Sequence, residues 1–314
     1  MKLSTGELVL KACETHTLVP AFNIPHIPMM APVVRALEQT NTFGLIQVAR
    51  LEWEKFESKS LRAIRDEYEK VKNERFTRLH LDHVPVIDED GLRVDFESII
   101  AEAIDLGYES VMVDGSRLEL DENIAATSQV AEMAHKVGIP AEGELGAVLG
   151  HEAGPLPPYE ELFSSGQGFT DPEQAKRFAK ESGVDWLSVA FGNIHGAISG
   201  AAKSQKKVAA RLNIEHLDRL REVANVPLVL HGGSGIQKQC LLESVRHGIA
   251  KINIGTTIRQ SYEQLREESV EKAQENVYNC VVELVSEELE IAGSAAVLSA
   301  QVGRRPAYFT GDQI

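Results

Sequence analysis

Short runs of apolar and β-branched residues recur along the chain, and such runs are typical of buried strands. There are eight of these runs, and turn-forming or polar segments separate them. The predicted strands are residues 18–23, 44–49, 77–82, 110–114, 139–145, 186–192, 226–232 and 250–255.

The segments between these runs have the periodicity of amphipathic helices. In residues 95–107 the apolar side chains recur at the spacing of one helix face. Residues 170–183 have a capping residue at their start, Thr170 or Asp171, and Gly183 at their end. Strand and helix therefore alternate throughout the chain.

Eight strand–helix units favour an α/β fold of the (β/α)8 TIM-barrel type, and an open doubly wound sheet is the structural alternative. We expect residues 1–314 to form one barrel domain, in which residues 257–314 are a helix-rich C-terminal extension. This extension is expected to pack on the barrel or on a neighbouring subunit. Residues 154–172 are rich in Gly, Pro and Ser, and predict a long loop after the fifth strand.

Composition narrows the classes of function. The chain has 314 residues, of which 47 are acidic and 32 basic, and its net charge of -15 argues against nucleic-acid binding. The three scattered cysteines fit neither a disulfide framework nor a thiolate metal site, and they indicate a reducing, cytoplasmic setting. No signal-peptide pattern and no run of roughly 18 apolar residues is present, so we expect no membrane association.

Polar residues lie at the ends of seven of the eight predicted strands. In a barrel of this type the chemistry is carried by the face where the strands end. Three histidines at that face, with an open fourth position, suit a catalytic Zn2+, and nearby carboxylates could position it or bind a second metal. The residues concerned are Asn23, Asp82, His83, Asp114, Glu144, His195, His231 and Asn253.

Two further features of this face have an alternative interpretation. Asp82 could exchange a proton with a metal-bound substrate hydroxyl, or it could orient a ligand histidine. The glycines that follow His195 and His231, together with residues 253–256, could expose backbone amides to a phosphate. An ordinary glycine turn is the alternative for these segments.

Seven motifs in this order resemble the class II, metal-dependent ketose-bisphosphate aldolases, which include fructose- and tagatose-bisphosphate aldolases. The resemblance extends from residue 19 to residue 296. The motifs are VPAFNI (19–24), LHLDH (79–83), SVMVDGSRLELDENI (110–124), AEGELG (141–146), FGNIHG (191–196), LHGGSGI (230–236) and KINIGT (251–256).

The resemblance implies a role for each of these segments. His83, His195 and His231 would bind Zn2+, and Asp82 would be the catalytic acid/base. Glu152 matches a mobile-loop glutamate that moves a proton on the ketone side. Asp114 and Glu144 match carboxylates of a second or alternative metal position. The residues expected to contact the substrate are Asn23, Gly196, Gly232, Gly233, Ser234, Asn253, Ile254, Gly255 and Thr256.

The activity implied by the resemblance is reversible cleavage of a phosphorylated ketose, a ketose 1,6-bisphosphate or a related ketose 1-phosphate. The products would be dihydroxyacetone phosphate and an aldehyde. A second divalent metal or a monovalent cation could assist, and relatives of this type are generally dimers or tetramers. The rival interpretations are another metal-dependent lyase or epimerase on the same barrel, and a noncatalytic aldolase-like subunit.

The sequence departs from the family pattern where relatives contact the aldehyde half of the substrate. The family motif QVSxGA has a serine at the position of Ala49, and an acidic or other polar residue often occupies the position of Gly255. Arg50 is an additional cation that could bind a different anion or form a surface salt bridge. Lys203 matches the family's lysine after the sixth strand only loosely. Fructose 1,6-bisphosphate is therefore only one candidate substrate. A sugar phosphate with a different far end, or a nonphosphorylated aldehyde partner, would fit the changed positions.

Overall fold

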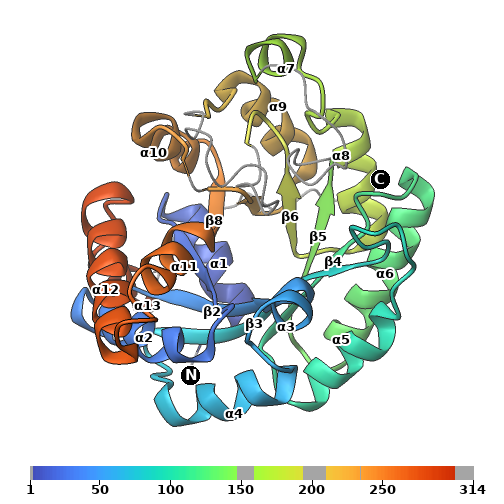
Figure 1. Cartoon of the computed structure of the whole chain (residues 1–314). Helices are drawn as coiled ribbons and strands as arrows, with labels where there is room; N and C mark the ends of the chain where they lie inside the picture. Colours follow the sequence, from blue (N-terminus) through green and yellow to red (C-terminus); the bar gives the residue numbers. More distant parts are fainter. Residues whose placement is uncertain (1–2, 147–158, 194–209, 234, 301–314) are drawn as a thin grey trace.

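Eight parallel strands close into a barrel in their order along the chain (Figure 1). The computed structural model describes residues 3–146, 159–193, 210–233 and 235–300. Closure of the ring by pairing of β1 with β8 confirms the (β/α)8 barrel and excludes an open sheet. The strands are β1 Val19–Asn23, β2 Gly44–Ala49, β3 Thr77–Pro85, β4 Ser110–Asp114, β5 Ala141–Leu145, β6 Trp186–Val189, β7 Leu228–Leu230 and β8 Ile249–Ile254.

Helices surround this barrel, and no described helix has the length and the hydrophobicity that a membrane span requires. Asp171 is the N-cap of α8, where its side chain accepts a hydrogen bond from the backbone of Gln174, and Gly183 ends the helix in the left-handed conformation. The helices are α1 Thr5–Glu14, α2 Met30–Gln39, α3 Arg50–Lys55, α4 Leu61–Val71, α5 Phe96–Asp105, α6 Leu120–Lys136, α7 Tyr159–Ser165, α8 Pro172–Ser182, α9 Ile214–Ala224, α10 Lys238–Arg246, α11 Thr256–Glu263, α12 Val270–Glu283 and α13 Ser294–Ser299.

The strands are buried on both faces, which explains why most of them are continuous apolar runs in the sequence. β6 and β7 end earlier than the sequence predicts, at Val189 and Leu230. Gly192 and Gly232 follow them with φ angles of 118° and 68°, which are incompatible with an extended strand. The two strands therefore end close to the predicted functional residues His231 and Gly232 and to the segment before His195.

The described part of the C-terminal extension packs on the barrel, as the sequence predicts. α12 lies against α2 (Figure 1). The Arg35 guanidinium of α2 lies over the Tyr278 ring of α12, 5.1 Å from its centroid. The backbone amide of Gly293 donates to the carbonyl of Thr40, 2.9 Å away. A π-helical turn, Leu284–Glu288, continues α12.

The prediction of an uninterrupted loop over residues 154–172 is wrong, because α7 lies within it. The cause is aromatic packing at this helix. The ring of Phe163 packs edge-to-face on Phe169 with a centroid distance of 6.0 Å, and the guanidinium of Arg211 lies over Phe163 at 4.7 Å. These contacts favour an ordered turn of helix in a segment whose composition indicates a loop.

Gly143 of β5 provides a test of how tightly the strands pack against the helices. A Cβ at this position would lie 2.9 Å from Thr127 Cγ2 and 3.1 Å from the Phe178 ring. We expect Gly143→Ala to lower the free energy of unfolding by about 1–3 kcal/mol, measured by urea denaturation. Gly6→Ala is the control, because a Cβ there would meet Pro140 at an ordinary 3.6 Å. Equal stability of the two variants would contradict this account.

Candidate active site

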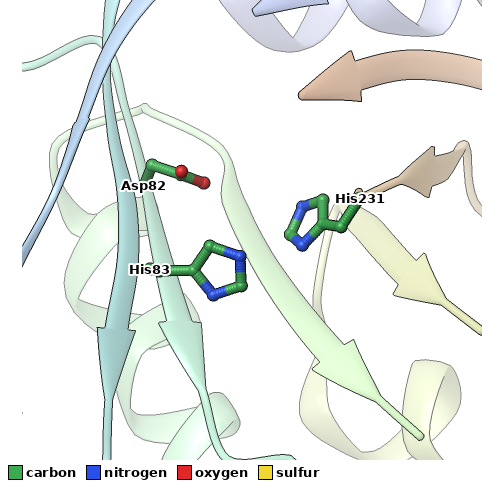
Figure 2. Close-up of side chains that lie close together, drawn as sticks. All are labelled: Asp82, His83 and His231. Atoms are coloured by element: carbon green, nitrogen blue, oxygen red, sulfur yellow. The ribbon is translucent and has the colours of Figure 1, made fainter. Parts of the chain in front are cut away.

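Asp82 and His83 lie near the end of β3, and both contribute to a cluster with His231, which follows β7 (Figure 2). Side chains normally alternate between the two faces of a strand. The pairing of β3 with β4 shifts register between Leu81 and Val84, and such irregularities re-aim side chains. This explains how two consecutive residues serve one site.

Three side-chain amides hold the carboxylate of Asp82. The amides of Asn23 and Gln47 donate to its Oδ2 at 2.9 and 3.2 Å, and the amide of Asn253 donates to its Oδ1 at 2.9 Å. Although burial acts in the opposite direction, the positive charge of His83 helps to hold the pKa of Asp82 below its ordinary value. Asp82 is therefore ionised at neutral pH and suited to accept a proton.

The donor atoms of the cluster are spaced closely enough for metal binding. One donor atom each from Asp82, His83 and His231 lies within 4.8 Å of the others, and the same holds for His83, Asp114 and Glu144. The two imidazole rings have a centroid distance of 4.6 Å. In Figure 2 the side chains of Asp82, His83 and His231 point toward one another. The structure thus brings together five of the residues predicted for catalysis and metal binding.

The fully buried ion pair of Glu142 and Lys251 orients the imidazole ring of His231. Nε2 of His231 lies 2.9 Å from Oε1 of Glu142, and Nζ of Lys251 lies 2.9 Å from Oε2 of the same carboxylate. Lys251 also donates to Oδ1 of Asn253 at 2.6 Å, and Asn253 in turn binds Asp82. A carboxylate on the second nitrogen of a histidine fixes the orientation and tautomer of a metal-binding ring.

The electrostatic potential of the cluster favours a cation. Although burial opposes protonation, the charge of Asp82 and the hydrogen bond to Asp114 raise the pKa of His83 to about 10. The pKa of His231 is also raised, because Glu142 and Glu144 outweigh burial and the charge of His83. The nearby carboxylates therefore favour a positive charge at both imidazole rings. A divalent metal ion can replace the protons of the two imidazoles and supply this charge.

The segments after β7 and β8 form a second part of the site. A Cβ at Gly233 would lie 2.6 Å from Ile252 Cδ1 and 2.8 Å from its Cγ1, so a side chain at this position would displace Ile252. Gly255 is the N-cap residue of α11, which begins at Thr256, and no side chain caps this helix end. Loops after strands seven and eight, together with a helix N-terminus, form the phosphate site of many barrels. Ile254, which the sequence predicts to contact the substrate, lies at the end of β8 and is buried.

Arg50 is the first residue of α3, directly after the end of β2. Its guanidinium lies 3.6 Å from Asp88 and 3.9 Å from Glu54. Both separations are longer than a good hydrogen bond, and a guanidinium has five N–H donors. Arg50 thus lies beside two carboxylates in long ion pairs, and its anion-binding role stays a proposal.

Several predicted site residues fall outside the described part of the chain. They are Glu152, His195, Gly196 and Ser234, together with Lys203. Their roles stay predictions.

Sequence reasoning missed four buried residues of the site: Gln47, Glu52, Glu142 and Lys251. A signal for two of them was present, because strand residues two apart face the same side. Glu142 precedes Glu144 by two positions, and Lys251 stands in the same relation to Asn253. The sequence does not mark Gln47, which pairs with Asn23 through the register of β1 and β2, or Glu52, whose place depends on the conformation of the chain after β2.

Comparison with known proteins agrees with this geometry. A family model described as fructose-bisphosphate aldolase class-II matches residues 3–296. The chain belongs to this family. It is 33% identical over 201 residues to a fructose-bisphosphate aldolase of Geobacillus stearothermophilus, and the match covers 64% of this chain and 61% of that relative. Because the match spans less than two thirds of that relative, its activity is not transferred to this chain.

Solved structures share the barrel over most of its length. The YdjI aldolase of Escherichia coli K12 superposes with a TM-score of 0.70 at 27% identity, covering 94% of this chain and 98% of that one. A putative fructose-1,6-biphosphate aldolase of Coccidioides immitis gives a TM-score of 0.72 at 24% identity, covering 92% and 96%. The second likeness is one of fold alone. The family resemblance and the barrel inferred from the motifs are both confirmed.

The buried pair of Lys251 and Glu142 generates a prediction about stability. Lys251→Met leaves the Glu142 carboxylate in the core without its lysine, which typically costs about 3–5 kcal/mol of unfolding free energy. The measurement is urea denaturation in the presence of a chelator, so that metal binding does not contribute. The double variant Lys251→Met/Glu142→Gln removes both charges and is expected to regain much of the loss. A single variant as stable as the wild type would contradict the assignment.

Proposed function

We propose that this protein is a zinc-dependent aldolase that reversibly cleaves a phosphorylated ketose into dihydroxyacetone phosphate and an aldehyde. The observation that carries the proposal is the ionised Asp82, held by three amides beside His83 and His231. Family membership supports the same reaction type. Cleavage of a carbon–carbon bond next to a hydroxyl-bearing carbon requires a base in a fixed position beside a metal-ligand cluster.

The donor set fits Zn2+ better than a hard cation. The imidazoles of His83 and His231 supply nitrogen donors, and we assign His195 as the third ligand. Asp114 and Glu144 are positioned to serve a second or alternative metal position. When bound, the metal supplies a Lewis acid that polarises the ketose carbonyl.

Asp82 performs the proton transfer on the aldehyde side. In cleavage its carboxylate takes the proton of the C4 hydroxyl as the bond between C3 and C4 breaks, and in synthesis it returns that proton to the aldehyde oxygen. The amides of Asn23, Gln47 and Asn253 fix both of its oxygens, so the base has little freedom to turn away. The electron pair of the broken bond stays with the ketone half, and in this proposal Glu152 protonates that carbon to give dihydroxyacetone phosphate.

The phosphate of the ketone half would bind at the segments after β7 and β8. The exposed amides around Gly232 and Gly233 and the uncapped start of α11 support this assignment. The aldehyde half meets a changed surface, because Ala49 lacks a hydroxyl and Gly255 lacks a side chain. We therefore infer a ketose phosphate whose far end differs from that of fructose 1,6-bisphosphate, with Arg50 available for an anionic group there.

Two rival functions remain to be separated from this one by experiment. A noncatalytic subunit has no need of a buried acid/base, so the retention of Asp82 among its three amides favours an enzyme. Another metal-dependent lyase or an epimerase could use the same cluster. Product analysis distinguishes these reactions, because an epimerase releases no dihydroxyacetone phosphate.

A coupled assay for dihydroxyacetone phosphate over a panel of ketose phosphates tests the reaction. We expect release from at least one substrate, loss of activity after thorough chelation, and recovery on addition of Zn2+. Activity that persists after metal removal would exclude the zinc mechanism. Turnover of fructose 1,6-bisphosphate equal to or better than that of every other substrate would refute the inferred change of specificity.

Removal of the carboxylate tests the role of Asp82. We expect Asp82→Ala to retain bound metal and the folded barrel, while kcat falls by about 10²–10⁴-fold, because general acid–base catalysis contributes this much. The measurements are steady-state kinetics and metal analysis of the same preparation. Asp66→Ala, on the exposed face of α4, is the control. Near-normal turnover of Asp82→Ala would remove its assignment as acid/base.

A further inference from the structure

Glu52 is a buried acid at a position where the family motif has a small residue. Aligned on Gln47, the pattern QVSxGA places an alanine at position 52, whereas this chain has a glutamate there. We propose that Glu52 is a positioning residue that fixes the side chain of Asn23 and, through Asn23, the acid/base Asp82. This inference rests on the aldolase function proposed above.

The environment of Glu52 differs from that of an ordinary helix-capping glutamate. Glu52 is the third residue of α3, and its Oε2 accepts a hydrogen bond from the backbone amide of Ala49 at 2.8 Å. Glu7 occupies the same position in α1 and accepts from the backbone amide of Ser4 at 2.7 Å. Glu7 is exposed, whereas Glu52 is only 8% exposed. Capping alone therefore does not explain why this acid is buried.

Asn23 connects Glu52 to the catalytic carboxylate. Its side chain interacts with the carboxyl group of Glu52, and its amide donates to Oδ2 of Asp82 at 2.9 Å. An asparagine amide has two N–H donors, so it can serve both carboxyl groups at once. Gln47 donates to Oδ1 of Asn23 at 2.8 Å and thereby fixes which way the amide faces. Contacts with Glu52 and Gln47 therefore fix the Asn23 amide group, which in turn fixes Asp82.

The protonation state of Glu52 suits this role. Burial, reinforced by the charge of Asp82, raises the pKa of Glu52 to about 8 despite the hydrogen bond from Ala49. The carboxyl group is therefore mainly neutral at pH 7. A neutral acid can hold Asn23 without placing a second negative charge beside Asp82, so Asp82 stays the ionised base of the pair.

The two departures from the family pattern lie next to this contact. Ala49, which replaces the family serine, supplies the backbone amide that Glu52 binds. A Cβ at Gly255 would lie 3.4 Å from Cβ and 3.5 Å from Oδ1 of Asn23, so a polar side chain at position 255 would also stand against Asn23. Glu52 thus approaches, from α3, the same Asn23 side chain that a side chain at position 255 would face.

Kinetics of Glu52→Ala, Glu52→Gln and Glu7→Ala on the substrate with the highest turnover test this proposal. We expect Glu52→Ala to lower kcat on the order of tenfold or more while KM changes by less than about threefold, because misplacement of a catalytic group lowers the rate of the chemical step. Glu52→Gln keeps a polar group of the same shape and is expected to regain most of the loss. Glu7→Ala removes the equivalent helix cap in α1 and should have the wild-type kcat.

Two results would overturn the proposal. One is a wild-type kcat in Glu52→Ala, and the other is a raised KM with unchanged kcat, which would indicate substrate contact instead of positioning. A double-mutant cycle with Asn23→Ala gives a separate check. If Glu52 acts through Asn23, the double variant has nearly the same kcat as Asn23→Ala alone. A double variant that also shows the full loss of Glu52→Ala would refute the action of Glu52 through Asn23.

The same variants separate this inference from the proposed function. Wild-type protein that releases dihydroxyacetone phosphate from no ketose phosphate would overturn the proposed function and this inference together. Wild-type turnover that Glu52→Ala leaves unchanged would overturn the role of Glu52 alone. Urea denaturation of each variant identifies a loss of activity that comes from unfolding.

Discussion

An ionised carboxylate inside a barrel requires polar partners that stabilise its charge, and the amides around Asp82 meet this requirement. They come from three different strands, β1, β2 and β8, so the position of the base depends on the relative placement of all three. Neutral amides stabilise the charge without cancelling it, because they donate hydrogen bonds and carry no net charge. The base therefore stays both ionised and fixed in direction.

The buried Lys251–Glu142 pair extends this network to the metal-ligand cluster. Lys251 contacts Asn253 beneath Asp82, and Glu142 contacts the far nitrogen of His231. Buried charges of this kind are costly, and replacing such a pair by apolar residues is often neutral or stabilising for a fold. Their presence at the base of the cluster is explained better by orientation of the ligand and the base than by stability.

The barrel and most of the site could be predicted from the sequence, because apolar runs, caps and motif order are local signals. The strand count, the cap at Asp171 and the meeting of Asp82, His83 and His231 followed from such signals. Packing of Phe163 and the approach of Glu52 to Asn23 could not be predicted, since both depend on contacts between distant segments. The register shift in β3 was likewise invisible, because residue type does not mark it.

Ring closure has a consequence for the order of folding. Asp82 and Asn253 are 171 positions apart in the sequence, and β8 supplies both Asn253 and Lys251. A chain emerging from the ribosome has completed β3 and β5 long before it can supply these partners. The acid/base site therefore matures only with the last strand, because an intermediate without β8 holds Glu142 without Lys251 and Asp82 without one of its three amides.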